Sequence, residues 1–346
     1  MKLKNVAKIL LFLLLFVGLF AWLNQITTPD RTGDLPWDEF YSLPNDTLDI
    51  VILGSSKANH TYNPLIINEA LGLDAYCLSA HGIGLDESYY ALKEAFKTQS
   101  PKIVVLELYS AKPTGDKKNE RAPLHRAYDA MHFSLNKARG ILSKVPLDES
   151  LEYFIPFTIN HSNWKTLSFK DMFRDKASGY TRYFGYYLVE YSIDQSEFIT
   201  LPENYMVDTR TILPDDDTMA TLARITALCQ ANDAQLVYVV SPGYGEDLFG
   251  YEDLHRLVNG LTPYAQAEGI LIWDYHRLLV DGEMQYMDFT DSHHTNTLGA
   301  DKVSRAFAED IESAFADLLA DYTQDWDIAD MLASYEEEYK KLSDAQ

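Results

Sequence analysis

Five short apolar runs, separated by longer helical patterns, are the feature that most restricts the fold of this chain. The first run, residues 49–54, is apolar at successive positions from Ile50 onwards and ends at a glycine. A strand with this composition is buried on both faces, as strands are in parallel sheets. The other four runs are 75–78, 102–108, 235–240 and 270–273. They predict a sheet of at least five buried strands.

Helical patterns alternate with these runs. They cover residues 85–96, 218–231 and 254–268, and a last helix is expected from 297 to about 322. Because parallel strands need crossover connections, this alternation predicts helices on both faces of the sheet. The predicted class is α/β, a three-layer α/β/α sandwich with a parallel, flavodoxin-like sheet.

Residues 116–217 interrupt this alternation. The stretch is rich in aromatic residues and has helical fragments but no clear strand. It is interpreted as a mostly helical cap inserted between the third and fourth strands. Most of its aromatic side chains are expected to form the core of the cap. Whether some of them line a substrate groove is left open.

The N-terminus carries an apolar stretch long enough to cross a bilayer. Three lysines, Lys2, Lys4 and Lys8, precede residues 9–23, which include no charged residue. This length and charge pattern predict a transmembrane helix at residues 1–24, with the N-terminus in the cytoplasm and the rest outside. A cleaved signal peptide is the alternative, but residues 24–27 offer no clear small-x-small cleavage site.

The remaining chain divides into three parts. Prolines at positions 29, 36 and 44 favour a linker, and Glu336, Glu337 and Glu338 mark an acidic C-terminal end. The expected parts are a linker at 25–47, an α/β domain at 48–322 that includes the cap, and an acidic tail at 323–346.

Composition excludes some classes of partner. The net charge of −23 argues against nucleic acid or an anionic membrane surface as the main partner, because a surface that binds either must neutralise phosphates. Cys77 and Cys229 are the only cysteines, so no cysteine metal site is available. Two buried thiols and one disulfide are both compatible with their positions.

The first candidate functional segment is Gly54-Ser55-Ser56-Lys57, at the end of the first strand. In an open parallel sheet, the carboxyl ends of the strands are where ligands bind. A serine after glycine also occurs in ordinary turns, so this segment alone is weak evidence for a nucleophile.

The second segment, Asp291-Ser292-His293-His294-Thr295-Asn296, lies just before the last helix. A serine hydroxyl is a poor nucleophile until an imidazole removes its proton, and a carboxylate can orient that imidazole. Asp291 and His294 can supply both groups to one point. The alternatives are a solvated loop acid, or a metal site with His293, for which Asp288 and Glu283 are the only nearby acids.

Together the two segments resemble the SGNH (GDSL-like) hydrolase superfamily, in which Gly-x-Ser follows the first strand and Asp-x-x-His precedes the last helix. The resemblance is to the membrane-anchored envelope branch, which includes the teichoic-acid D-alanine-transfer protein and the alginate and peptidoglycan O-acetylation proteins. It implies Ser56 as nucleophile, His294 as general base and Asp291 as its orienting group. Gly54, Ser55 and Asn296 would be supporting loop residues.

The same resemblance implies an oxyanion hole that is complete only in part. The backbone N–H groups of Ser56 and Gly82 match two of its donors. The third donor in the superfamily is an asparagine after the third strand, whereas this chain has Glu107-Leu108-Tyr109-Ser110 there. Tyr109 or Ser110 would have to replace it, because loss of one such donor costs about 10²–10³ in rate.

The function implied by the resemblance is that of a serine esterase or O-acyltransferase, with acetyl as the expected acyl group. Its substrate would be a cell-envelope or exported polysaccharide or a teichoic-acid-like polymer. A membrane-bound O-acyltransferase would be its partner, and neither a cofactor nor a metal is expected. The alternative is a non-catalytic module that binds polymer or scaffolds such a partner.

Overall fold

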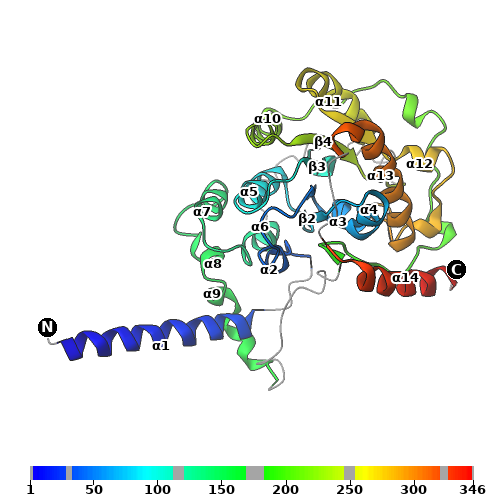
Figure 1. The fold of residues 1–346 in the computed structure, drawn as a ribbon. Helices are drawn as coiled ribbons and strands as arrows, with labels where there is room; N and C mark the ends of the chain where they lie inside the picture. The colour runs from blue at the N-terminus through cyan, green and yellow to red at the C-terminus, as the bar shows by residue number, and fades with distance from the viewer. Residues whose placement is uncertain are drawn as a thin grey trace.

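A five-stranded, all-parallel sheet lies at the centre of the computed structural model (Figure 1). The structure describes residues 3–28, 33–111, 121–168, 183–244, 254–319 and 326–344. All five predicted strands are present, within one or two residues of their expected ends. They are β1 (Ile50–Gly54), β2 (Ala75–Ser79), β3 (Ile103–Glu107), β4 (Gln235–Val240) and β5 (Leu271–Asp274).

The strand order fixes where a ligand can approach the sheet. The order is β2-β1-β3-β4-β5, so β1 lies between β2 and β3. The chain leaves β1 for β2 on one side and then returns to β3 on the other. This reversal opens a crevice at the carboxyl ends of β1 and β3.

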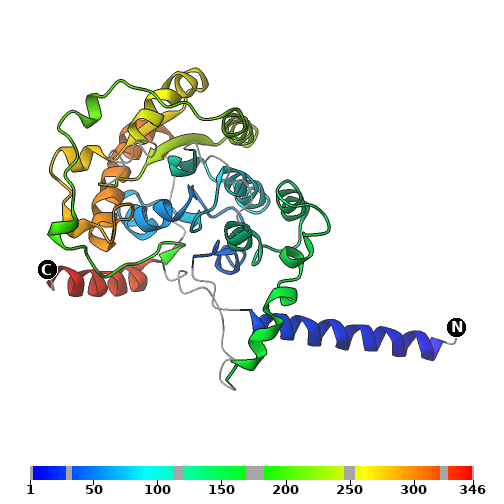
Figure 2. The ribbon, with the colours of Figure 1, turned by 180° about the vertical axis from the view of Figure 1, so that it is seen from behind.

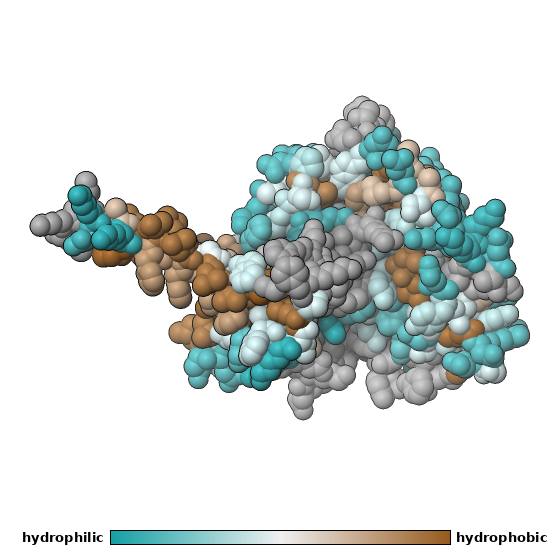
Figure 3. All heavy atoms as spheres, turned by 90° about the horizontal axis from the view of Figure 1, so that it is seen from below, coloured by the Kyte–Doolittle hydropathy of each residue, from teal (hydrophilic) through white to brown (hydrophobic). Residues whose placement is uncertain are grey.

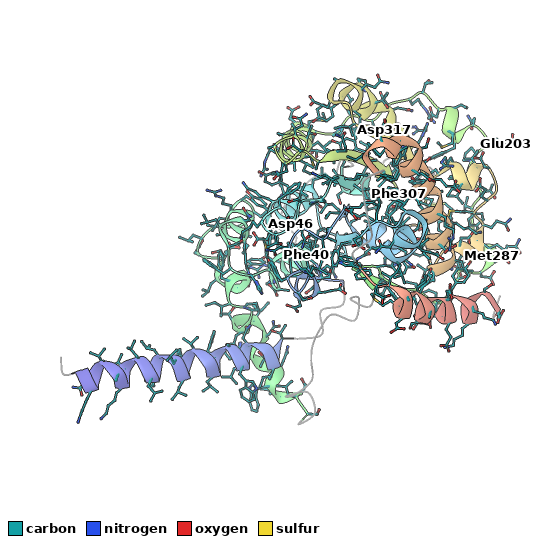
Figure 4. All side chains as sticks on the ribbon, viewed as in Figure 1. Phe40, Asp46, Glu203, Met287, Phe307 and Asp317 are labelled. Atoms are coloured by element: carbon teal, nitrogen blue, oxygen red, sulfur yellow. The ribbon has the colours of Figure 1, made fainter. Side chains whose placement is uncertain are left out.

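Successive strand residues enter two different hydrophobic cores, as the period of a strand requires. In β1, Val51 and Leu53 belong to one core, which also receives apolar residues of the helices α5, α10 and α11. Ile50 and Ile52 belong to the other, which receives residues of α3, α12 and α13. Figure 4 labels Phe40 of α2 in the first core and Phe307 of α13 in the second.

The four helices predicted around the sheet are confirmed. They are α5 (Leu85–Ala95), α10 (Asp216–Gln230), α11 (Leu254–Glu268) and α13 (Thr297–Leu319). Shorter helices and turns connect these elements. They are α3 (Ser56–Thr61), α4 (Pro64–Leu71), η1 (Leu108–Ala111), α12 (Arg277–Val280) and η8 (Tyr286–Asp288).

The α-helices described in the insertion after β3 all lie in its first half. That half contains α6 (Arg121–Tyr128), α7 (Leu135–Leu142), α8 (Leu151–Phe154), α9 (Phe157–Asn160) and η2 (His161–Lys165). In residues 183–215 the described elements are only two short turns, η5 (Gln195–Glu197) and η6 (Tyr205–Val207).

The described residues 183–215 differ from the expected helical cap because their backbone pairs with the rest of the domain. Phe184 O accepts a hydrogen bond from Cys77 N at 2.9 Å, and Tyr187 N donates to Asn59 O at 2.8 Å. Val189 O accepts from Thr297 N at 3.1 Å. These bonds satisfy peptide groups that a helix would otherwise satisfy internally.

The segment expected to be a linker contributes to the core. Leu35 is buried, and so are Trp37 and Phe40 of the short helix α2 (Trp37–Phe40). Trp37 Nε1 donates to Ala127 O at 2.9 Å, which ties the segment to α6. A free spacer would leave these large apolar side chains in water. Burying them in the core is more favourable, so the segment packs against the domain.

The C-terminal region also differs from a simple acidic tail. It forms α14 (Ala329–Asp344), whose Tyr335 is 2% exposed and packs against Tyr183 and Tyr186. Cys77 and Cys229 are both buried free thiols.

The N-terminal helix α1 (Leu3–Thr27) projects away from the rest of the molecule (Figures 1 and 2). Its Lys4–Asn24 portion has a mean hydropathy of 2.6, and none of its most apolar stretch is buried against other residues. This is a helix long and apolar enough to span a membrane.

Replacing Trp37 by alanine is expected to lower the free energy of unfolding by about 3–5 kcal/mol, because it leaves a large cavity beneath the sheet. Urea unfolding of the detergent-solubilised chain, followed by circular dichroism, measures this change. Val207→Ala, at a side chain that is 73% exposed, is the control and should change stability by less than about 0.5 kcal/mol. Equal stability of the Trp37→Ala and parent proteins would show that this segment is a spacer.

Candidate active site

Ser56 stands at the carboxyl end of β1, where α3 begins. Gly54 makes this placement possible, since a Cβ atom there would lie 2.8 Å from Glu107 Cβ and 2.9 Å from Ala58 Cβ. Any larger residue would push β1 away from β3 or from α3. Lys57, next along the chain, is fully buried and donates to Ser241 O at 3.2 Å.

His294 meets Ser56 across 238 residues of sequence. Ser56 Oγ lies 2.7 Å from His294 Nε2. The other ring nitrogen, Nδ1, lies 3.0 and 2.9 Å from the two carboxylate oxygens of Asp291. Because a carboxylate can only accept, Nδ1 carries the proton and Nε2 is left to accept from the serine hydroxyl. The three residues therefore form one hydrogen-bonded chain.

Asp291 is suited to remain ionised. Burial raises the pKa of its carboxyl, but the hydrogen bond and charge of His294 and the N–H groups of His293 and His294 lower it more. The two backbone bonds measure 2.8 and 2.9 Å. The net pKa lies well below its ordinary value, so the imidazole faces a negative charge at neutral pH.

Asn296 holds the loop that carries His294. Its Oδ1 accepts from the backbone N–H groups of Leu298 and Gly299, at 3.0 and 3.2 Å, and so caps the start of α13. Its Nδ2 donates to Met287 O at 2.7 Å. Thr295 Oγ1 donates to His60 O at 2.8 Å, which fastens the loop to α3. Asn296 thus supports the site from behind.

Gly82 occupies the loop after β2 with a φ of 71°, a conformation that favours glycine. Within the part of the chain that the structure describes, no group accepts a hydrogen bond from its N–H. The carbonyl of the same peptide, His81 O, accepts from Arg126 Nη1 at 2.9 Å. Since C=O and N–H of one peptide point in opposite directions, Arg126 fixes the direction of the Gly82 N–H.

The two candidates for the third oxyanion donor are placed differently. Ser110 Oγ donates to Ile83 O at 2.9 Å, so its proton is already used. The Tyr109 ring lies 5.2 Å from Lys57 Nζ. Ser55 has a buried hydroxyl with no hydrogen-bond partner among the described residues.

These groups open onto a single cleft of about 700 Å³. Ser55, Ser56, Gly82, Tyr109 and Ser110 line one part of it. The wall continues along α6, the loop after α7 and the first turns of α5 and α10. The volume is that of a pocket for a small molecule or a short polymer segment.

Two histidines that the sequence patterns did not single out lie beside the triad. The ring of His60 lies 4.5 Å from that of His294, centroid to centroid, and His60 Nε2 lies 3.3 Å from His81 Nε2. Burial, followed by the charges of His294 and His81, holds the pKa of His60 well below its usual value. Burial, then His294 and Arg126, lower the pKa of His81 to about 4.

Both histidines are therefore neutral at neutral pH. A sequence signal for them existed: His60 stands four residues after Ser56, and His81 directly precedes Gly82. Residues this close in sequence to Ser56 and Gly82 must lie near them in space, whether the chain continues as a helix or as a loop.

A second histidine–carboxylate set lies at the end of β5 and is closed to ligands. Asp274 accepts from His276 Nδ1 at 2.7 Å and from His255 Nδ1 at 2.9 Å. Gly243 N donates to His276 Nε2 at 3.2 Å. His276 is fully buried, so this set joins β5 to the loop after β4. In the described residues no three histidine, cysteine or acidic side chains are grouped to hold a metal.

Comparison with known proteins identified no relative of this chain. No protein-family model matches the chain, and no curated protein matches its sequence.

The lowered pKa of His81 predicts a loss of stability in acid. An unfolded histidine titrates near 6.5, whereas His81 in the folded protein titrates near 4, so the folded state binds fewer protons between these values. The stability is complete above about pH 6.5 and is lost as the pH falls toward 4. In His81→Gln, the melting temperature should fall less over this range than in the parent. His161→Gln, at an exposed histidine, is the control, and equal slopes in all three proteins would contradict the prediction.

Proposed function

We propose that this protein is a membrane-anchored serine esterase or O-acyltransferase that works through an acyl-Ser56 intermediate. The observation that carries the proposal is the hydrogen-bonded chain from Ser56 through His294 to Asp291, open to a cleft at the carboxyl ends of parallel strands. In this proposal the domain is a three-layer α/β/α sandwich of the SGNH type. The two cores on alternate strand residues support that assignment.

The first half of the reaction follows from the hydrogen bonds of the site. Ser56 Oγ attacks the acyl carbonyl while His294 Nε2 takes its proton. The N–H groups of Ser56 and Gly82 stabilise the tetrahedral oxyanion. When this species collapses, the bond to the leaving oxygen breaks and His294 returns the proton to that oxygen. The products are acyl-Ser56 and a free alcohol.

The second half reverses these roles. A hydroxyl of the acceptor, or water, gives its proton to His294 and attacks the acyl carbon. The ester bond to Ser56 then breaks, and Ser56 Oγ recovers the proton from His294. Asp291 stabilises the imidazolium in both halves and is not itself protonated. No cofactor is needed.

The expected location follows from α1. Lysines precede its apolar span and the catalytic domain follows it, so the domain would lie outside the cytoplasm. An acceptor in the cell envelope, such as a polysaccharide, is then within reach. A membrane-bound O-acyltransferase is the proposed partner, because an acyl donor made in the cytoplasm must cross the bilayer.

The charges of the cleft favour a neutral acceptor over a polyanion. Among the described residues that line it, the two basic ones, Lys144 and Arg224, both form ion pairs with Asp86, at 2.5 and 3.2 Å. Asp215 and Asp217 are exposed on the same wall. A phosphate- or uronate-rich polymer would meet these carboxylates, and the basic groups are already paired.

A non-catalytic module that binds polymer or scaffolds the acyltransferase is the second candidate. It is favoured by the absence of an asparagine after β3 and by the Ser110 hydroxyl, which is committed to Ile83 O. The short Ser56–His294 bond disfavours it, since a binding module has no need of a polarised hydroxyl.

A fluorophosphonate probe separates these two candidates. The probe should label the chain at Ser56, because it requires a base-activated hydroxyl and no complete substrate site. His294→Ala should slow labelling about 10²- to 10⁴-fold, and Asp291→Asn should slow it less. Mass spectrometry of the labelled peptide identifies the residue.

Ser56→Ala should abolish labelling, and Ser55→Ala is the matched control, which should retain most of it. Circular dichroism must show that each variant is folded. A folded parent protein that reacts with none of several probes would exclude the esterase and acyltransferase, and would leave the binding module.

The acceptor preference is tested after acylation with p-nitrophenyl acetate. Hydrolysis of acyl-Ser56 by water should be slow, and a neutral oligosaccharide should accelerate release of the acyl group more than an oligomer of uronic acid. Mass spectrometry should find the acetyl group on the neutral sugar. Faster transfer to the uronic-acid oligomer would contradict the argument from charge, and equal rates with and without sugars would identify an esterase.

A further inference from the structure

Exposed apolar side chains gather on one part of the insertion. Outside α1, twelve large apolar side chains of the described residues are exposed, and seven of them lie between residues 133 and 164. They are Phe133, Leu135, Leu142, Leu147, Leu151, Ile159 and Trp164. Such a concentration marks an interaction surface, because monomeric soluble proteins scatter their exposed apolar residues. Residues 133–165, from the turn before α7 to the end of η2, are called the docking segment below.

The docking segment touches the membrane-spanning part of α1. The rings of Phe157 and Phe20 lie 5.4 Å apart, edge to face. Asn163 Nδ2 donates to Thr27 O at 2.9 Å, which satisfies a carbonyl at the end of α1. Phe20 lies four residues before Asn24, the end of the apolar portion, which corresponds to about 6 Å along a helix. With α1 in a bilayer, α9 would therefore reach into the membrane interface.

The direction of α1 shows which face would meet the bilayer. A spanning helix lies within a few tens of degrees of the membrane normal. In Figures 1 and 2, α7 and α8 lie on the side of the domain toward which the N-terminal end of α1 extends. Figure 3 shows apolar surface on the domain where α1 joins it. The exposed groups of α7, α8 and α9 thus share the side that a bilayer around α1 would occupy.

The charge of the docking segment also suits a lipid surface. Its exposed charged residues balance, Arg139 and Lys165 against Asp148 and Glu149, whereas the whole chain has a net charge of −23. Most of the protein would be repelled by anionic headgroups, and this segment would not. Trp164, which is 63% exposed, has a side chain of the type enriched at membrane interfaces.

From these contacts we infer that the docking segment binds the outer surface of the lipid bilayer in which α1 is anchored. The inference rests on the proposed anchoring by α1 and is independent of the proposed chemistry. The lipid occupies the apolar face of α7, α8 and α9, and α1 positions that face by its contacts with Phe157 and Asn163. The domain is then held at the membrane in one orientation by two attachments.

This orientation has a consequence for the cleft. Pro123 and Leu124 of α6, and Ser143 and Lys144 directly after α7, line the cleft that contains Ser56. One wall of the cleft therefore belongs to the same helical layer that meets the lipid. A donor or acceptor held at the membrane surface reaches Ser56 without diffusing into the surrounding space.

The full chain, reconstituted in nanodiscs of phosphatidylcholine and phosphatidylglycerol, provides the test. Single cysteines placed at Ile159 or Leu151 are labelled with an environment-sensitive fluorophore, and lipids with a nitroxide near the headgroup are the quencher. Cys77 and Cys229 are buried with their thiol pKa raised to about 12, so the label should discriminate against them. Both labels should lose most of their intensity when the quencher is present.

Labels at two further positions serve as controls, one for exposure outside the docking segment and one for insertion of α1. Val207→Cys, on an exposed apolar residue outside the docking segment, should keep its intensity. Phe12→Cys, within α1, should be quenched by a nitroxide placed deep in the acyl chains. Quenching at Phe12 but not at Ile159 and Leu151, in these purely lipid discs, overturns the inference and leaves a protein partner to cover the segment. No quenching at Phe12 overturns the anchoring by α1 instead.

Discussion

The hydrogen bond between Ser56 and His294 joins the beginning and the end of the α/β domain, and the rest of the site depends on it. It forms only if α3 and the loop before α13 are held together. That contact is fixed behind the site by bonds that involve no triad side chain: Thr295 Oγ1 donates to His60 O, and Asn63 N donates to Ser304 Oγ at 2.8 Å. Ser56 and His294 are thus held together by backbone and hydroxyl groups that remain buried.

Three imidazoles lie close to Ser56, and they would repel one another if more than one were protonated. Burial of His60 and His81 prevents this. A protonated His60 or His81 would repel the charge that His294 acquires in the proposed reaction. Because their burial favours the neutral form, the two rings line the site as polar but uncharged groups. Arg126 Nη1 donates to His81 O, which places its positive charge behind the loop that contains Gly82.

The insertion links the site to the membrane in the proposed arrangement. Its first half supplies a wall of the cleft and the apolar face beside α1, while its second half pairs with the backbone near Cys77, Asn59 and Thr297. An element that is fastened to the sheet at one end and to α1 at the other gives the active site a fixed height above the bilayer. Such a constraint suits chemistry on a substrate that is itself held at the membrane.

The sequence by itself determined the five strands, the four large helices and the three residues of the triad. Apolar runs and short motifs are local properties, and the alternation of the runs with helical patterns favoured strands over buried helices. It did not determine that Trp37 and Tyr335 join the core, or that residues 183–215 are irregular and pair with the backbone of other elements. Those outcomes depend on which distant surface offers burial or a backbone partner. The neighbourhood of His60, His81 and Arg126 is likewise a tertiary result, since three separate elements meet there. The local sequence pattern determines which residues form helices and strands, whereas only their packing determines which side chains lie together in one site.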